Sequence, residues 1–268
     1  MTAAPRIRVL LACDLDGTLL DAEGTPVLDI GPTLAALRVA GAPLAVCTGR
    51  PLHAARRAVE RLGAEPAVYM CYHGALVVDP DAGRQLRYLP LPQAAASTLA
   101  AEALDHGLGV TVYDVDEPRE LVHPVAEGGP QGDARSRGRE PVGDLLGPSV
   151  TRLVLHGRPE LVSLLLPGFA KRWAGRLRME PIRPGFIGVL HARADKGDAV
   201  RLTAAYLGVP LDRVIACGDS EADESLLRVA GVRIAVGDAP PALRRLKPLV
   251  VRREDLAATL RIEAGALL

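Results

Sequence analysis

The feature that most constrains the fold is an alternation of short apolar runs with segments of helical periodicity. The apolar runs cover residues 8–13, 43–47, 66–72, 213–217 and 232–236, and helical patterns occur at 32–41, 52–63, 198–208 and 224–231. Strands that alternate with helices in this way form right-handed βαβ units and a parallel sheet. Because both ends of the chain carry the pattern, we predict one α/β core with a Rossmann-like parallel sheet, formed by residues 1–83 and 186–268.

The middle of the chain has a different pattern. Strand-like segments at 110–115 and 151–157 are mixed with helical segments at 93–107 and 159–175. This mixture predicts an inserted α+β domain over residues 84–185 rather than further parallel units. Residues 128–143 are rich in Gly, Pro and Arg and have neither period, so we expect a long loop there.

Length and composition exclude several classes of protein. A chain of 268 residues can form a large core and a smaller second domain. Lys and Arg together number 32, as do Asp and Glu, and aromatic residues make up 3%, so a nucleic-acid partner is not expected. No apolar run approaches the roughly 20 residues of a membrane span, and the N-terminal apolar run ends in Asp rather than in a cleavage site. We predict a cytoplasmic protein with no membrane partner.

The four cysteines, Cys13, Cys47, Cys71 and Cys217, lie inside apolar runs and have no C-x-x-C spacing. Their positions favour small core residues over a zinc site or a disulfide framework. Three of them directly precede a polar motif, so a metal-responsive or redox-sensitive thiol is the alternative.

Four of the apolar runs end in polar, glycine-containing motifs: DLDGT (14–18), TGR (48–50), HGA (73–75) and GDSEADE (218–224). Ligands of open parallel sheets bind beyond the carboxyl ends of the strands, so these motifs should meet. The carboxylates that would converge there are Asp14, Asp16, Asp219 and Asp223. Like charges so close raise each other's pKa or bind a cation, and an oxygen-only site favours Mg²⁺. Each motif alone is also compatible with a turn, a helix start or an N-cap.

In this order the motifs resemble those of the haloacid dehalogenase superfamily of phosphotransferases, and within it the Cof-type phosphatases with a C2-type cap. The resemblance spans nearly the whole chain, through DLDGTLLD, AVCTGRP, CYHGALVVD, ADKGDAV, CGDSEADESLL and AVGDAPPALRRL. It implies the fold of that superfamily, with residues 84–185 as the cap. It also implies Mg²⁺-dependent hydrolysis of small phosphomonoesters, with sugar phosphates as the leading class. The expected partner is thus a small phosphorylated metabolite, and the expected protein is a monomer or homodimer.

The resemblance also implies roles for individual acidic residues. Asp14 would be the nucleophile that forms an aspartyl-phosphate and would contact Mg²⁺ through its other oxygen. Asp16 would protonate the leaving group and then deprotonate water, and its backbone carbonyl would be a second metal ligand. Asp219 would complete the protein ligands, and Asp223 would orient the metal's waters or Lys196.

The remaining predicted site residues would hold the substrate. Thr48 and the Gly49 amide would bind phosphoryl oxygens, and Arg50, His73 and Gly74 follow in the same motifs. A carboxylate that attacks a phosphomonoester dianion is repelled by it, so the site needs cations, which Mg²⁺ and Lys196 would supply. The chain has lysine only at 171, 196 and 247. A lysine at the predicted helix start in ADKGDAV therefore indicates a need for a compact point charge, although an exposed first-turn lysine is the structural alternative.

Two positions depart from the family pattern. The fourth motif usually carries Asn where this chain has Ala222, so a side-chain contact near the metal is missing, and Ser220 and Glu221 are candidates to compensate. The third motif usually begins with Asn where this chain has His73, which would either contact the substrate or fill a polar pocket.

A phosphomutase and a non-catalytic phospholigand-binding module are the alternative functions. Five arginines of the insertion and its border are either contacts for a second anionic group or solvated surface: Arg135, Arg137, Arg139, Arg183 and Arg193.

Overall fold

The computed structural model describes residues 7–114, 118–121, 135–136 and 146–268. They form two compact units, which we call the first unit (Met1–Tyr88 with Asp195–Leu268) and the second unit (Leu89–Ala194). Each unit has its own sheet and its own buried core.

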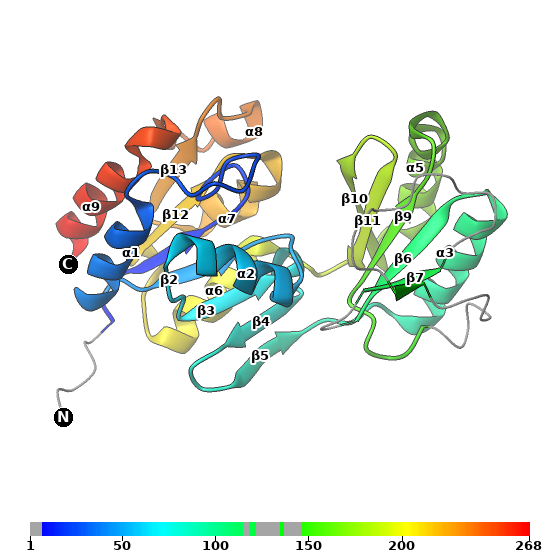
Figure 1. Ribbon diagram of the computed structural model, residues 1–268, viewed down its shortest axis with the longest axis horizontal. Helices are drawn as coiled ribbons and strands as arrows, with labels where there is room; N and C mark the ends of the chain where they lie inside the picture. Colours follow the sequence, from blue (N-terminus) through cyan, green and yellow to red (C-terminus); the bar gives the residue numbers. More distant parts are fainter. Residues whose placement is uncertain (1–6, 115–117, 122–134, 137–145) are drawn as a thin grey trace. The chain divides into compact units, whose positions relative to one another are not determined.

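The first unit is built on an eight-stranded sheet in the order β14-β13-β12-β1-β2-β3-β4-β5 (Figure 1). Neighbouring strands from β14 to β3 are parallel, which confirms the predicted α/β core, whereas β4 and β5 are antiparallel. The strands span Leu10–Cys13 (β1), Leu44–Cys47 (β2), Val68–Cys71 (β3), Leu76–Asp79 (β4), Arg84–Tyr88 (β5), Val214–Gly218 (β12), Val232–Val236 (β13) and Leu249–Val251 (β14).

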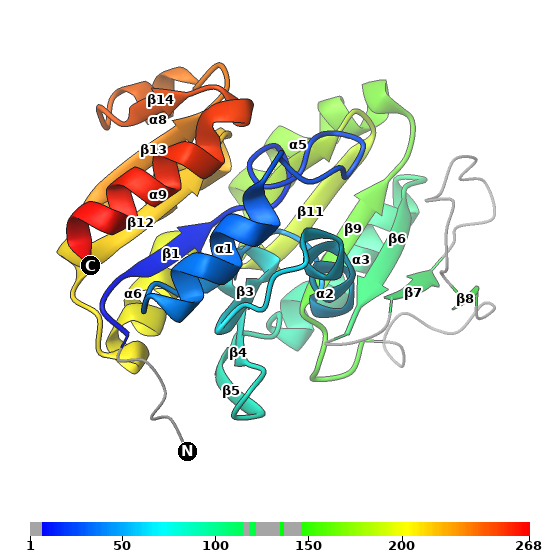
Figure 2. The same cartoon turned by 60° about the vertical axis from the view of Figure 1, so that its left-hand side comes forward.

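Helices cover both faces of this sheet. On one face, Val200 of α6 and Leu227 of α7 share a buried cluster with Leu10 of β1. On the other face α1 and α9 lie side by side (Figure 2), and Arg261 donates to Thr33 Oγ1 at 2.6 Å. The helices span Ile30–Val39 (α1), Leu52–Leu62 (α2), Lys196–Leu207 (α6), Glu224–Val229 (α7), Pro241–Arg244 (α8) and Leu256–Leu267 (α9), with 3₁₀ turns at Tyr72–Gly74 (η1), Leu211–Arg213 (η2), Glu221–Asp223 (η3) and Arg253–Asp255 (η4). With both faces covered, the ends of the strands are where a ligand can reach the sheet.

The second unit is α+β, as predicted. Its six-stranded sheet has the order β10-β11-β9-β6-β7-β8, antiparallel except between β7 and β8. Leu99 of α3 and Trp173 of α5 pack into one core with Leu155 of β9. The elements span Gln93–Asp105 (α3), Gly109–Tyr113 (β6), Pro118–Leu121 (β7), Arg135–Ser136 (β8), Arg152–His156 (β9), Pro159–Trp173 (α5), Leu177–Arg183 (β10) and Phe186–His191 (β11).

The units divide after residues 88 and 194, whereas the sequence pattern predicts divisions after 83 and 185. Residues 84–88 pair with β4 as β5 and so extend the sheet of the first unit. Residues 186–191 pair with β9 and β10 as β11 and so belong to the sheet of the second. The sequence pattern does not reveal these pairings, because a strand next to a turn looks the same in either sheet.

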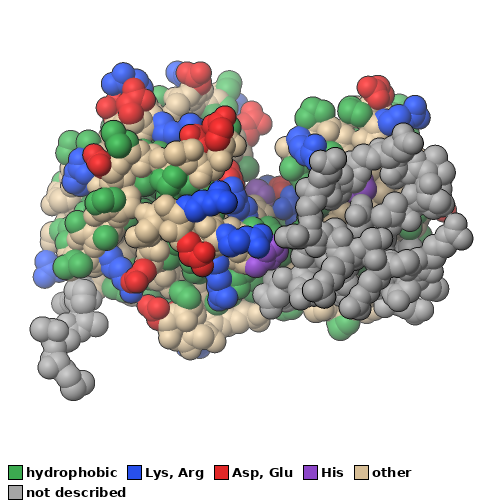
Figure 3. All heavy atoms as spheres, in the orientation of Figure 1, with side chains coloured by type: hydrophobic (Ala, Val, Ile, Leu, Met, Phe, Trp, Pro, Cys, Tyr) green, Lys and Arg blue, Asp and Glu red, His purple; other side chains and the backbone are tan. Residues whose placement is uncertain are grey.

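Most of the loop predicted at 128–143 lies outside the described residues. Within it, Arg135–Ser136 forms the short strand β8 against β7, so that part of the segment is a strand rather than a loop. No helix in the described part of the chain is both long and apolar enough to cross a membrane. On the face of the first unit seen in Figure 3, basic and acidic side chains are interspersed, in keeping with the balanced composition.

Candidate active site

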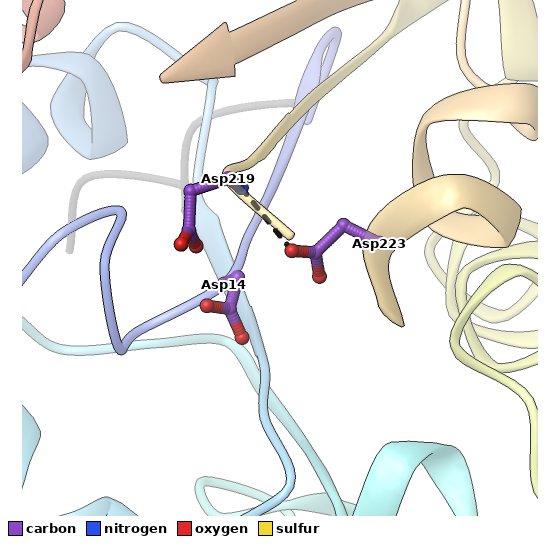
Figure 4. A group of neighbouring side chains, drawn as sticks. All are labelled: Asp14, Asp219 and Asp223. Atoms are coloured by element: carbon purple, nitrogen blue, oxygen red, sulfur yellow. Dashed lines mark hydrogen bonds between the residues drawn. The ribbon is translucent and has the colours of Figure 1, made fainter. Parts of the chain in front are cut away.

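Three carboxylates meet at the carboxyl ends of β1 and β12. These strands are parallel neighbours with Cys13 opposite Cys217, so the residues that follow them leave the sheet together. Asp14 continues this pairing, since its backbone N–H donates to the Cys217 carbonyl at 3.0 Å. Figure 4 shows Asp14, Asp219 and Asp223 with their carboxyl groups turned toward a common space. One oxygen from each lies within 4.8 Å of the others.

Lys196 lies between two of these carboxylates. Its Nζ is 2.7 Å from Asp14 Oδ1 and 2.6 Å from Asp223 Oδ1, and the lysine side chain is 3% exposed. Lys196 is the first residue of α6, and Asp195 caps that helix by accepting from the Asp198 N–H at 2.8 Å. The lysine is therefore buried at a fixed helix start, which excludes the alternative of an exposed first-turn side chain.

Asp223 is held by its second oxygen. Oδ2 accepts from the Asp219 N–H at 3.2 Å, from the Ser220 N–H at 3.1 Å and from the Ser220 hydroxyl at 3.0 Å. Of the two candidates to compensate for Ala222, Ser220 is thus the one whose hydroxyl bonds to the acidic cluster. Three donors to one carboxylate oxygen fix the orientation of Asp223 and leave Oδ1 for Lys196.

The turn after Asp16 packs against Asp219. Gly17 has φ 86°, and a Cβ at this position would lie 2.1 Å from Asp219 Oδ2, so glycine is required here on both counts. The next residue, Thr18, is fully buried and donates through Oγ1 to Asp219 Oδ1 at 3.0 Å. Thr18 was not among the predicted site residues, although its place in the D-G-T motif was a usable signal.

The side chain of Asp16 points to Arg50 rather than into the carboxylate cluster. Arg50 Nε donates to Asp16 Oδ2 at 2.8 Å, and a second guanidinium nitrogen donates to Oδ1. This bidentate pair raises the pKa of Arg50 through the hydrogen bond to Asp16, against the opposing effect of burial. The Asp16 side chain remains 51% exposed.

The other predicted substrate residues line the ends of β2 and β3. Thr48 is fully buried, and its Oγ1 accepts from the Arg50 N–H at 3.1 Å while its carbonyl accepts from the His73 N–H at 3.0 Å. His73 has φ 52°, and its ring lies so near Gly49 that a Cβ there would be 2.4 Å from Nε2. The structure therefore brings Thr48, Gly49, Arg50 and His73 together.

Gly74 packs against the start of α6. It has φ 88°, and a Cβ would lie 2.5 Å from the Asp195 carbonyl oxygen, one residue before Lys196. This close approach gives Gly74 a structural role beside the helix that carries the lysine. Its predicted contact with a substrate stays a prediction.

The electrostatics of the cluster favour a further positive charge. Burial raises the pKa of Asp14 to about 8, although Lys196 lowers it. Burial, with Asp223 adding to it, also raises the pKa of Asp219. Burial alone would lower the pKa of Lys196, but Asp14 and Asp223 outweigh it and hold that pKa well above its usual value. One ammonium group is thus too little for three carboxylates, and an all-oxygen donor set fits a hard divalent cation.

All four cysteines are buried and free of disulfides. Burial raises the pKa of Cys71 to about 12 and also raises the pKa of Cys47. The pKa of Cys13 is raised by a hydrogen bond with Cys217 and by burial. Because the thiolate is the reactive form, these environments agree with the prediction of core residues and not with a reactive thiol.

In the second unit, one ion pair joins two strands of the sheet and another lies within a single strand. Glu180 of β10 pairs with Arg152 at 3.7 Å and with Arg178 at 3.6 Å. Of the arginines considered as anion contacts, Arg183 lies over the Phe186 ring at 3.5 Å. The side chains of Arg135, Arg137 and Arg139 lie outside the described residues.

Comparison with known proteins identifies the class. The profile of the haloacid dehalogenase-like hydrolases matches residues 11–124 and 140–255. This chain therefore belongs to that family of hydrolases, and the predicted resemblance to its Cof-type phosphatases is confirmed.

Individual relatives match over most of both chains. The putative phosphatase YxeH of Bacillus subtilis is 27% identical over 241 residues, which are 87% of this chain and 88% of YxeH. The 5-amino-6-(5-phospho-D-ribitylamino)uracil phosphatase YitU of the same organism is 25% identical over 256 residues, which are 88% of this chain and 89% of YitU. The crystal structure of a haloacid dehalogenase-like hydrolase from Bacteroides thetaiotaomicron superposes with a TM-score of 0.82 at 19% identity and covers 95% of this chain and 98% of that one. The likeness in structure confirms the predicted fold.

Proposed function

We propose that this protein hydrolyses small phosphomonoesters, with sugar phosphates as the leading class, in a Mg²⁺-dependent reaction through an aspartyl-phosphate on Asp14. The observation that carries the proposal is the buried Asp14 carboxylate, bonded to Lys196 and facing Asp219 and Asp223. Relatives named for phosphatase activity support the reaction class, but the substrates in their names differ from one another, so they support no single substrate.

Asp14, Asp219 and Asp223, with the backbone carbonyl of Asp16, are the residues we propose to hold or orient Mg²⁺. When bound, the metal would supply charge neutralisation to the phosphoryl oxygens. Lys196 would add a second positive charge at the same place, and its bond to Asp223 keeps it there. Thr48 and Gly49 would bind phosphoryl oxygens at the ends of the neighbouring strands.

The reaction would proceed in two displacements on phosphorus. An Asp14 oxygen forms a bond to phosphorus while the bond to the leaving oxygen breaks, and Asp16 gives that oxygen a proton. Asp16 then takes a proton from water as the water oxygen bonds to phosphorus, and the bond to Asp14 breaks. Asp14 is regenerated and inorganic phosphate leaves.

The ion pair between Asp16 and Arg50 adds a requirement to this scheme. Both oxygens of the Asp16 carboxylate accept hydrogen bonds from the Arg50 guanidinium, so in this arrangement neither is turned to a leaving group. Asp16 would therefore leave Arg50 before it acts as the acid. An anionic group of the substrate is a suitable replacement partner for Arg50, and His73 at the same rim would contact the substrate with it.

The second unit is proposed to be the C2-type cap, the part of the protein in which substrate specificity would lie. A cytoplasmic location and a monomeric or homodimeric state stay predictions.

The test is inorganic phosphate release from a panel of phosphorylated metabolites, with Mg²⁺ and with EDTA. We expect release by the wild type that EDTA removes and that Asp14→Asn abolishes. Asp81→Asn is the matched control, because Asp81 is exposed and pairs only weakly with Arg38 at 3.5 Å. Little release, together with transfer of phosphate between positions of a sugar, would favour the mutase. Absence of both Mg²⁺ binding and release would favour the non-catalytic module.

A further inference from the structure

Arg253 belongs to none of the motifs that define the site, yet it contacts the turn that follows Asp16. It is the first residue of η4, between β14 and α9. Its guanidinium donates twice to the Gly17 carbonyl oxygen, from Nε at 3.2 Å and from a terminal nitrogen at 2.7 Å. A forked donor that bonds one oxygen from two nitrogens restrains both the position and the direction of that carbonyl.

The Gly17 carbonyl is a sensitive place for such a contact. The turn is packed so tightly that a single methyl group on Gly17 would collide with the Asp219 carboxylate. The Gly17 N–H donates to the Leu20 carbonyl at 2.8 Å, which closes the turn. Asp16 precedes it and Thr18, which bonds Asp219, follows it. A rotation of the Gly17 peptide would therefore move the predicted proton carrier and a contact to Asp219 together.

The segment that carries Arg253 is anchored to the core through α9, which buries Leu256 and Leu260. The helix α9, which follows η4 directly, packs along α1 (Figures 1 and 2). The hydrogen bond from Arg261 to Thr33 joins these helices more than one turn beyond η4. The guanidinium is therefore carried by a segment that is anchored through α9 and lies far from the Gly17 turn in the sequence.

The preceding residue provides a contrast within the same segment. Arg252 pairs with Asp255 at 2.9 Å and with Glu254 at 3.1 Å, and its side chain is 74% exposed. Both of these contacts stay on the surface of η4. Two adjacent arginines thus differ in one respect that matters here, which is whether they contact the Gly17 turn.

We propose that Arg253 is a positioning residue that holds the Gly17 turn against Asp219 and so sets the geometry of the metal site and of Asp16. The inference rests on the proposed function for its consequence in catalysis, whereas the hydrogen bonds from Arg253 to Gly17 do not require a bound metal. Arg253 touches no reacting atom, and it acts through the carbonyl of the Gly17–Thr18 peptide.

The test compares Arg253→Met and Arg253→Lys with the control Arg252→Met. Hydrogen exchange in EDTA, read on a peptide that covers Leu15–Leu20, reports the turn without any metal or activity. We expect faster exchange there in Arg253→Met, an unchanged rate in Arg252→Met, and partial recovery in Arg253→Lys. Equal exchange in Arg253→Met and the wild type would overturn the inference.

Mg²⁺ binding by calorimetry gives the second readout. Loss of a residue that orients a ligand typically weakens metal binding by about 10-fold or more, so we expect that loss in Arg253→Met and not in Arg252→Met. Unchanged Mg²⁺ affinity and unchanged kcat in Arg253→Met would overturn the inference while the proposed function stands. A wild type that binds no Mg²⁺ would instead contradict the proposed function, and the proposed effect of Arg253 on a metal site with it.

Discussion

Replacing Lys196 with Met removes the ammonium group between Asp14 and Asp223. The side chains of Lys196, Asp14 and Asp223 are 3%, 7% and 0% exposed, and both ion pairs are shorter than 3 Å. Removing one partner of a buried ion pair costs about 3–5 kcal/mol, because the remaining charge stays out of water. Asp14 can lower its part of this electrostatic cost by binding a proton, whereas Asp223 loses its cationic partner. We expect the free energy of unfolding to fall by about 4 kcal/mol near neutral pH.

The size of this loss should depend on pH. A carboxyl group whose pKa is higher in the folded than in the unfolded protein loses stability as pH rises between the two values. Burial raises the pKa of Asp14 to about 8, and Lys196 is the group that opposes this rise most. In Lys196→Met the pKa of Asp14 therefore lies higher still. The difference in stability between wild type and variant should grow as pH rises through about 8.

Urea unfolding in EDTA, followed by far-ultraviolet circular dichroism, measures this difference. The single Trp of the chain, Trp173, lies in the second unit, so its fluorescence reports that unit separately. Lys171→Met is the matched control, because Lys171 is exposed on α5. A loss in Lys196→Met no larger than in Lys171→Met would refute the buried charge network.

Three other perturbations of the cluster have measurable outcomes. Asp16→Asn should lower kcat by about 10²- to 10⁴-fold. Mg²⁺ binding, measured by calorimetry, should be unchanged, because the Asp16 side chain bonds Arg50 and not the carboxylate cluster. A loss of Mg²⁺ affinity would contradict this separate role of the Asp16 side chain. Gly17→Ala should destabilise the first unit by about 1–2 kcal/mol or more in thermal unfolding. It should also weaken Mg²⁺ binding, because the new Cβ collides with Asp219. A variant with unchanged stability and Mg²⁺ binding would show that the turn is not packed against Asp219. Without metal, the free energy of unfolding should fall as pH rises from about 4 to about 8, since the pKa of Asp14 is raised in the folded protein. Asp14→Asn should make stability depend less on pH, and an equal dependence in both proteins would show that another group titrates.

The parallel core was predictable because its evidence is local. The strands β1, β2, β3, β12 and β13 coincide with apolar runs, and each predicted core helix is present within a few residues. A parallel sheet buried on both faces needs continuous apolar strands, so the pattern is strong. The hairpin strand β5 was not predicted, because its residues RQLRY are polar and only partly buried and give no such signal.

The candidate site was predictable as a set of residues but not as a set of contacts. The motifs identified the carboxylates and Lys196, whose convergence follows from parallel strand ends. They did not predict that Asp16 would bond Arg50, because two motifs 34 residues apart carry no information on side-chain orientation. Nor did they indicate Arg253, which reaches Gly17 from 236 residues away through the packing of the C-terminal helix.

The measurement that tests the central claim most directly is a search for a phosphoryl group on Asp14. The protein would be mixed with a phosphomonoester that it hydrolyses and Mg²⁺, quenched in acid within one turnover, digested and analysed by mass spectrometry. Asp16→Asn, which should slow both displacements, would be treated in parallel with a phosphomonoester whose leaving oxygen needs no proton, so that the second displacement is slowed more than the first and the intermediate accumulates. We predict one added phosphoryl group on the peptide that carries Asp14, lost in Asp14→Asn. Phosphate release without any label on that peptide, or a label that persists in Asp14→Asn, would contradict the account.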